Sequence, residues 1–229
     1  MNYFTFDGVS SETYNAYIAE SNMFDASAED VESITIPGRN GAYHIPKNRF
    51  NVFDASVVIY FPSDMQTNVD DLRNFLLSRK KSCTYSEYLK PNEFRMARFK
   101  SAFILSSSSK ESASMTLNFE CQPERYLLSG QSTTQFTANG TITNPTLFDA
   151  KPLIRIYGTG TLTVGDFTVT VSTVDSYVDI DFNTLNAYKG DVNCNGNVSF
   201  GELVLVPGAN AITLSGITKA IITPRWFTL

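Results

Sequence analysis

Alternation of apolar and polar positions predicts β-strands along most of the first 130 residues. In the clearest case Met115, Leu117, Phe119 and Cys121 fall on one face of a strand, and the polar residues between them fall on the other. Strands are expected at Tyr3–Phe6, Glu32–Ile36, Ser56–Phe61, Phe94–Leu105 and Ser114–Cys121. The run Ser106–Ser109 is interpreted as a polar connection between the last two strands. The first part of the chain is therefore predicted to be mainly β.

One segment of this part has helical periodicity instead. Apolar residues recur at helical spacing between Val69 and Leu76, so a helix is expected over Asn68–Lys80. Asn68 is placed to cap the first turn, where two aspartates would favour the positive end of the helix dipole. The basic run Arg79–Lys81 at the other end is interpreted as a solvated helix end, with an anion site as the alternative.

A tight loop follows the strand expected at Glu32–Ile36. Residues 37–41 (PGRNG) contain two glycines, a proline and an asparagine, a composition that predicts a sharp turn with a positive φ angle. Arg39 stands at its tip and is expected to be exposed. This loop and the predicted helix are candidate contact elements in an assembly.

A second series of strands begins after Asn144. The Gly165-Asp166 pair predicts a two-residue hairpin, because Leu162 and Val164 alternate before it and further apolar residues alternate after it. Later strands are expected around Val178–Phe182, Leu203–Val206, Ala211–Leu214 and Lys219–Thr223. Short strands with regular Gly and Pro breaks indicate a sandwich or jelly roll.

The stretch between residues 130 and 144 is rich in Ser, Thr, Gly and Asn, which indicates a connection between domains. We therefore expect two domains, 1–130 and 131–229. With 229 residues, of which 42% are hydrophobic, the chain is long enough to bury two small cores. Its 17 Phe and 11 Tyr against a single Trp favour strands over helices.

Charge and cysteine content narrow the class of protein. The net charge of −5 disfavours stable nucleic-acid binding, which needs a basic surface. The three cysteines are far apart, odd in number and without a CxxC pair, so neither a disulfide framework nor a zinc site is expected. No apolar run approaches the length of a membrane span, and the first residues do not resemble a signal peptide.

Three features resemble catalytic motifs only weakly. His44 is the single histidine, and no nucleophile elbow accompanies it, so a surface or packed role is expected. Gly158-Thr159-Gly160 precedes a predicted strand rather than a helix, which leaves no helix N-terminus for a phosphate. Asp179 and Asp181 alternate along one strand and are interpreted as exposed, solubilising charges. No catalytic or cofactor-binding residue is predicted.

A sharper match is the segment from Asp191 to Glu202, which fits the spacing of an EF-hand calcium loop. Asp191, Asn193 and Asn195 occupy positions one, three and five, Gly196 position six and Glu202 position twelve. The segment also resembles half of a dockerin. Strand-like sequences flank it in place of helices, so an Asn/Gly-rich turn is preferred and no metal ligand is assigned.

Several segments together resemble the distal tail protein of long-tailed (siphovirus-type) bacteriophages. They are FTFDGVSSETYN near the start, ITIPGRNG, LRNFLL in the helix, NFECQPERY, NPTLFDAKPLIRIYGTG, VPGANAITLSG and the final PRW. They follow the order of that family and cover most of the chain. The resemblance implies an N-terminal, β-sandwich-like domain with one helix that forms a hexameric ring, and a C-terminal galectin-like β-sandwich.

The same resemblance implies a function and a set of partners. The ring would join the tail tube protein to the tail-associated lysin or tip protein, and the C-terminal domain would dock a receptor-binding protein. Such a protein is assembled in the cytoplasm of the host bacterium and stays at the virion tail tip. The alternative is a carbohydrate-binding or adhesin β-sandwich that acts alone; an enzyme is disfavoured, because no base, nucleophile or metal cluster is evident.

Overall fold

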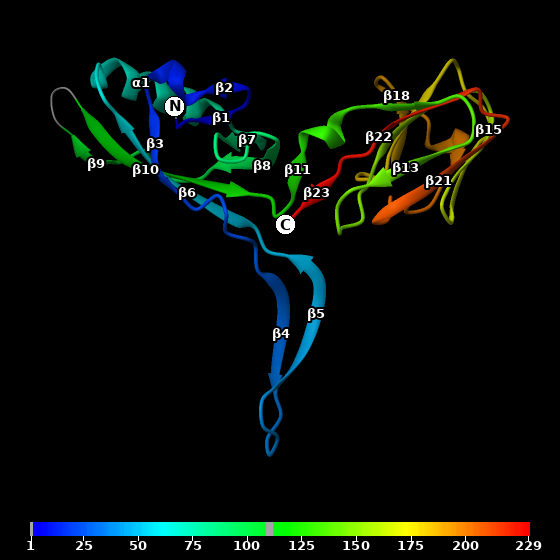
Figure 1. Ribbon diagram of the computed structural model, residues 1–229, viewed down its shortest axis with the longest axis horizontal. Helices are drawn as coiled ribbons and strands as arrows, with labels where there is room; N and C mark the ends of the chain where they lie inside the picture. Colours follow the sequence, from blue (N-terminus) through cyan, green and yellow to red (C-terminus); the bar gives the residue numbers. More distant parts are fainter. Residues whose placement is uncertain (1, 109–111) are drawn as a thin grey trace. The chain divides into compact units, whose positions relative to one another are not determined.

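The computed structural model describes residues 2–108 and 112–229 (Figure 1). Contacts divide them into two compact units: the first extends to Arg125 and includes Leu229, and the second is Tyr126–Thr228. Strands dominate the described residues, which contain a single α-helix, α1 (Met65–Ser78), so the predicted mainly β class is confirmed. Short 3₁₀ turns occur at Ser11–Tyr14, Leu128–Gln131 and Asn195–Asn197.

The first unit is built on an antiparallel sheet in the order β2-β1-β7-β8-β10-β6-β3. These strands are β1 (Phe4–Phe6), β2 (Val9–Ser10), β3 (Tyr17–Ser21), β6 (Phe53–Phe61), β7 (Cys83–Glu87), β8 (Glu93–Phe99) and β10 (Ala113–Cys121). As the alternation predicted, Met115, Leu117, Phe119 and Cys121 of β10 are all fully buried. The sheet curls on itself, because the Ile18 amide of β3 donates to the carbonyl of Asn2 beside β1.

An aromatic cluster fills the interior of the first unit. The ring of Phe119 lies 4.7 Å from Tyr85, 5.2 Å from Phe6, 5.5 Å from Phe99 and 5.7 Å from Phe4, measured between centroids. The quadrupoles of the rings make such tilted and edge-on arrangements favourable. This attraction adds to the free energy that the rings contribute by being buried. The cluster joins β1, β7, β8 and β10 into one core.

Two sequence expectations in this unit are wrong. The strand expected at Phe94–Leu105 ends at Phe99, and the serines after it form strand β9 (Leu105–Ser108) in place of a polar connection. β9 pairs with β10 through backbone hydrogen bonds, which serine can make as well as any residue, so side-chain polarity did not reveal it. Ser109, which ended the expected connection, lies outside the described residues.

The helix is also displaced from its expected start. α1 begins at Met65, whose side chain packs against the core, and its N-cap is Asp64 with a φ of 49° and no side-chain capping bond. Asn68 therefore lies within the first turn, where its backbone N–H donates to the backbone carbonyl of Asp64. The helix buries Val69, Leu72 and Leu76 as the periodicity predicted.

Between β3 and β6 the chain forms a separate two-stranded arm (Figure 1). Its strands are β4 (Glu29–Thr35) and β5 (Ala42–Phe50), which pair only with each other among the described strands. The PGRNG turn connects them, and Gly38 and Gly41 adopt φ angles of 80° and 79° there. The predicted tight turn with positive φ is thus confirmed.

The second unit is a β-sandwich of two antiparallel sheets. One has the order β12-β22-β14-β17-β18-β19 and the other β13-β21-β15-β16-β20, and apolar side chains from both fill one core. The first sheet comprises β12 (Thr134–Phe136), β14 (Leu153–Tyr157), β17 (Val178–Asp181), β18 (Asn186–Lys189), β19 (Val192–Asn193) and β22 (Lys219–Thr223). The second comprises β13 (Gly140–Asn144), β15 (Gly160–Val164), β16 (Phe167–Val171), β20 (Val198–Ser199) and β21 (Gly208–Ser215). Two short strands, β11 (Arg125–Leu127) and β23 (Phe227–Thr228), pair with each other.

The predicted hairpin in this unit is confirmed. β15 and β16 pair from Gly160 opposite Val171 to Val164 opposite Phe167, and Gly165 supplies the positive φ of 56° that the turn requires. The strand expected at Leu203–Val206 is absent, since only Leu205 forms an isolated bridge, to Ala150. Leu203 and Leu205 are nevertheless buried, so their alternation reflects core packing without regular sheet pairing.

Candidate functional site

The most distinctive surface of the first unit is one face of the β4–β5 arm. Ile34 lies directly opposite Tyr43, and Glu32 lies opposite Ile45. Residues that face each other across an antiparallel pair lie on the same side of the sheet, as do residues two apart along a strand. Ile34, Tyr43 and Ile45 therefore form one apolar stripe, and they are 40–53% exposed. We call these three residues the apolar face of the arm.

The opposite face of the arm is mixed, because Val31 lies opposite Pro46 and Thr35 lies opposite Ala42 on it. Ser33 and His44 are paired there, with 2.9 Å between the serine hydroxyl and Nδ1 of the imidazole. Near the base, on the side of Glu32 and Ile45, charged residues continue the other face: Lys47 lies 3.8 Å from Asp30 and 4.0 Å from Glu32, and Arg49 donates to Asp30 through Nε at 2.7 Å. Ile34, Tyr43 and Ile45 thus form an exposed apolar patch toward the tip of the arm, and no residue that the structure describes covers it. A two-stranded hairpin is only marginally stable alone in water, so such a face favours contact with another surface.

Sequence reasoning located the turn of the arm but missed its apolar face. The signal was present, because Ile34 and Ile36 alternate with polar residues before the turn, and Tyr43 and Ile45 do so after it. Two alternating runs around a Gly-rich turn predict a hairpin. His44, considered as a catalytic base, is exposed on the opposite face, where its imidazole is hydrogen-bonded to the Ser33 hydroxyl.

The Gly158-Thr159-Gly160 segment is a turn between β14 and β15, and no helix follows it. A methyl group at Gly160 would overlap the carbonyl oxygen of Ser215, and its φ is 140°. The glycine is required by this close backbone approach in the sandwich, which accounts for the motif without a phosphate.

The structure corrects the interpretation of Asp179 and Asp181 as exposed charges. Asp179 is buried and accepts two hydrogen bonds from Arg155, at 2.7 and 2.8 Å. Asp181 is partly buried and accepts two from Arg225, at 2.7 and 3.0 Å. Burial raises the pKa of Asp181, but the hydrogen bonds from Arg225 and from the Asn183 amide outweigh it, so the pKa lies below its ordinary value. Asp179 thus joins β17 to β14, and Asp181 joins β17 to the connection that follows β22.

The segment that matches a calcium loop forms strands and a turn. Asn193 accepts a hydrogen bond from the Asn195 amide at 2.8 Å, and the Asn195 side-chain oxygen accepts one from the Ala187 amide at 2.6 Å. These oxygens are therefore occupied by the backbone, while Asp191 and Glu202 are exposed. The described residues contain no group of three or more His, Cys, Asp or Glu side chains placed to hold a metal ion.

A buried polar group lies beneath the sheet of the first unit. Glu87 is 2% exposed and accepts hydrogen bonds from the Tyr85 hydroxyl at 2.5 Å and from Ser21 at 2.8 Å. Burial raises the pKa of Glu87 above its ordinary value. Arg95 is fully buried and lies over the ring of Phe53, 4.0 Å from its centroid. Glu87 is thus part of the core of the first unit.

All three cysteines are free. Cys121 is fully buried, and desolvation raises the pKa of its thiol to about 12, which makes the thiolate inaccessible at neutral pH. The pKa of Cys83 is also raised, first by burial and then by Asp7.

At the end of α1, Arg79 was expected to be a solvated cation. It is paired with the carboxylate of Asp7, with 2.6 Å between Nε and Oδ2.

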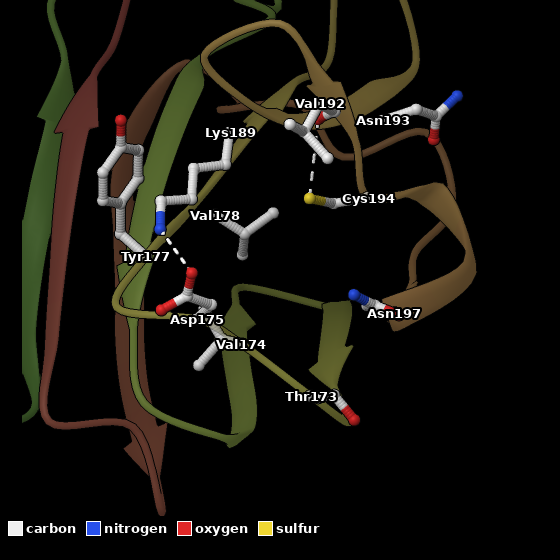
Figure 2. A pocket seen from close by; sticks show the side chains of 10 residues that line it. All are labelled: Thr173, Val174, Asp175, Tyr177, Val178, Lys189, Val192, Asn193, Cys194 and Asn197. Carbon is white, nitrogen blue, oxygen red and sulfur yellow. Dashed lines mark hydrogen bonds and ion pairs between the residues drawn. The ribbon is translucent and has the colours of Figure 1, made fainter.

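The second unit contains a pocket with a volume of about 280 Å³, lined by valines together with a few polar and charged side chains (Figure 2). It lies between the β16–β17 connection, which contributes Thr173–Val178, and the β18–β19 hairpin. Asp175 and Lys189 form an ion pair at its side, 2.8 Å apart, while Cys194 and Asn197 face the pair from across the pocket. The calcium-like segment thus supplies one wall of this pocket.

Within the described residues, no helix combines the length and apolar character that crossing a bilayer requires. No protein-family model matches the sequence, and no characterised protein matches it significantly.

Solved structures do match the fold. The structure of the Dit protein of phage SPP1, described as a paradigm of the hub adsorption apparatus in phages that infect Gram-positive bacteria, aligns with a TM-score of 0.76 and 15% identity. The alignment covers 97% of this chain and 98% of that one. A chain in the baseplate of phage p2, in its activated conformation with Sr, aligns over the same shares with a TM-score of 0.53 and 11% identity. The two units therefore have the fold of phage tail hub proteins, as the resemblance predicted.

Proposed function

We propose that this protein is a structural hub at the tip of a phage tail, where six copies form a closed ring. The observation that carries the proposal is the unpartnered apolar face of the β4–β5 arm in a chain whose whole length has the fold of a hub protein. The role is structural and not enzymatic.

In the proposed ring, the arm of one subunit packs on a different surface of the next subunit. A ribbon that projects from one subunit and packs on a different surface of the next makes a heterologous interface, and such interfaces close into rings when the rotation permits. Fully burying an aliphatic or aromatic side chain gives about 1.5–3 kcal/mol, so covering three half-exposed ones would contribute about 2–4 kcal/mol per interface. Six such contacts in a closed ring reinforce one another.

In this proposal the ring joins the tail tube protein to the tail-associated lysin or tip protein. The separate core of the second unit makes that unit a candidate dock for a receptor-binding protein. The solved structures with this fold come from a hub and a baseplate, which supports a place at the virion tail tip after assembly in the host cytoplasm. The domain roles follow the boundary expected near residue 130.

Sedimentation velocity of the purified full chain, with negative-stain imaging, tests the ring. We expect a hexamer that the variant Ile34→Asp disrupts, because a carboxylate would be placed in the apolar contact. Thr35→Asp is the matched control, since residue 35 is also exposed but lies on the opposite face of the same strand. The proposal is refuted by a protein that remains monomeric at high concentration and with its tube partner present. Equal effects of the two variants would refute the role of the apolar face alone.

A further inference from the structure

We propose that the pocket beside Asp175 and Lys189 binds one ring of a neutral saccharide. Its lining includes Asp175, Lys189, Val178, Cys194 and Asn197. This inference adds a ligand site to the second unit and does not depend on ring formation.

The size of the pocket limits the ligand. Its volume of about 280 Å³ lies just under the range of about 300–1,000 Å³ that is typical of pockets for drug-sized ligands. It therefore has room for one small ring and its substituents, and not for a folded peptide segment or a nucleotide. The pocket opens at the surface, where the side chain of Asp175 is 94% exposed, so a longer glycan could continue into solvent.

The charges in the pocket favour a neutral ligand. The carboxylate of Asp175 and the ammonium group of Lys189 are joined at 2.8 Å and cancel each other. An anion would meet Asp175, and a cation would meet Lys189, so neither gains from the pair. A sugar hydroxyl is both donor and acceptor, and neighbouring hydroxyls on one ring can bind the carboxylate and the ammonium group together.

One further polar side chain, that of Asn197, faces the ion pair from across the pocket (Figure 2). This side chain makes no hydrogen bond to any residue that the structure describes. Asn193 and Asn195, by contrast, use their side-chain oxygens to hold the turn, through the Asn195 and Ala187 amides. The turn is thus preorganised by two of its asparagines and leaves Asn197 free to bind a ligand.

The remaining surface of the pocket is apolar, as the carbon face of a sugar ring requires. Val178 is buried at the base, and Val174 is half-buried beside it. Tyr177 is held in place by Arg155, whose guanidinium carbon lies 4.2 Å from the ring centroid. Figure 2 shows Val178 behind the space enclosed by Lys189, Asp175 and Cys194. Apolar walls with a few placed polar groups are the usual composition of a ligand site.

Saturation-transfer NMR with the full chain tests the proposal directly. The probes are glucose, galactose, N-acetylglucosamine and rhamnose, with glycerol 3-phosphate as an anionic comparison. We expect transfer to at least one neutral sugar with a dissociation constant of about 1 mM, and a loss of about tenfold or more in Asn197→Ala and in Asp175→Ala. Asp166→Ala is the control, because Asp166 is an exposed carboxylate in the Gly165-Asp166 turn and does not line the pocket.

The thiol of Cys194 supplies a second readout. It lies half-buried in the pocket, so a bound sugar should slow its alkylation by iodoacetamide, while Cys83 in the first unit should react at an unchanged rate. Both measurements work on monomer or ring, so a failure of the hub proposal would leave them unaffected. The site is refuted if no neutral sugar in the panel gives transfer, if only glycerol 3-phosphate binds, or if both pocket variants bind as the wild type does.

Discussion

Arg155 and Asp179 form a bidentate ion pair across strands β14 and β17, with Nε to Oδ1 at 2.7 Å and Nη2 to Oδ2 at 2.8 Å. The two residues are direct cross-strand partners in the sheet. Hydrogen bonding to Asp179 raises the pKa of Arg155 above its ordinary value. The carboxylate is buried, whereas the arginine is partly exposed and also stacks on Tyr177.

Removing Arg155 should therefore destabilise the second unit. Arg155→Met leaves the buried carboxylate of Asp179 without its two donors, and we expect a loss of about 2 kcal/mol in the free energy of unfolding. Urea unfolding followed by the fluorescence of Trp226, the single tryptophan and a buried residue of this unit, measures it. Lys189→Met is the control: its partner Asp175 is exposed, so a loss below about 1 kcal/mol is expected. Equal losses of stability in Arg155→Met and Lys189→Met would contradict a stabilising role for the buried Arg155–Asp179 pair.

Glu87 should make the first unit less stable as the pH rises. Its pKa is raised by folding, so the folded state holds this proton more tightly than the unfolded state does. Stability from the protonated carboxyl is present below the ordinary value of 4.5 and is lost as the pH rises through the folded pKa. In Glu87→Gln, unfolding followed by circular dichroism should lack this decline above pH 4.5.

Asp181 supplies the opposite sign for comparison. Its pKa is lowered in the folded state, so its contribution is present above the ordinary value of 3.8 and lost as the pH falls through the folded pKa. The Trp226 signal of the second unit should therefore report acid destabilisation, which Asp181→Asn reduces.

For the first unit, a pH dependence that is identical in wild type and Glu87→Gln would contradict the prediction for Glu87. It would show that burial of Glu87 has no energetic consequence.

Gly160→Ala should be among the most damaging single substitutions in the second unit. The new methyl group would overlap the Ser215 carbonyl, and the backbone has a φ of 140°, so we expect a loss of about 3 kcal/mol or more. Gly196→Ala is the matched control, because a methyl group there has no atom within 4 Å. Thermal unfolding of both variants, compared with wild type, measures the two losses of stability. A Gly160→Ala protein as stable as wild type would contradict the structure.

Calcium should leave the melting temperature unchanged. The side-chain oxygens of Asn193 and Asn195 already accept backbone hydrogen bonds, and a cation would have to break them to recruit both. Calorimetric titration beside a chelator-treated sample should show no binding tighter than millimolar. A melting temperature that calcium raises, and that Asp191→Asn restores, would make Asp191 a ligand.

The ring should not bind double-stranded DNA. Six copies at −5 each would carry about −30, a charge that repels phosphates at low salt and suits a channel through which a genome passes. Asp64 is exposed, and Asp54 is exposed although it pairs with Lys100 at 3.1 Å, whereas Glu87 is buried and cannot face a channel. Fluorescence anisotropy at low salt checks this, and salt-dependent micromolar binding would indicate a DNA-contacting role.

Local pattern was sufficient wherever the deciding interactions lie within a few residues. The alternation of β10 predicted its buried face, and the Gly165-Asp166 pair predicted the hairpin of β15 and β16, because side-chain periodicity and turn chemistry are properties of a short segment. The apolar spacing between Val69 and Leu76 predicted α1 for the same reason. Its start was missed because packing of Met65 on the core extended the helix.

The sequence by itself therefore determined the mainly β class, the principal turns and the buried faces of the strands. The tertiary structure alone decided which distant residues contact one another. Asp179 and Asp181 pair with arginines that are 24 and 44 residues away in the sequence. Residues from two separate connections line one pocket. The tertiary structure also showed that the strands beside the PGRNG turn leave an apolar face without a partner in the described chain. Ion pairs, pockets and unpartnered faces depend on contacts between distant segments, which no local period encodes.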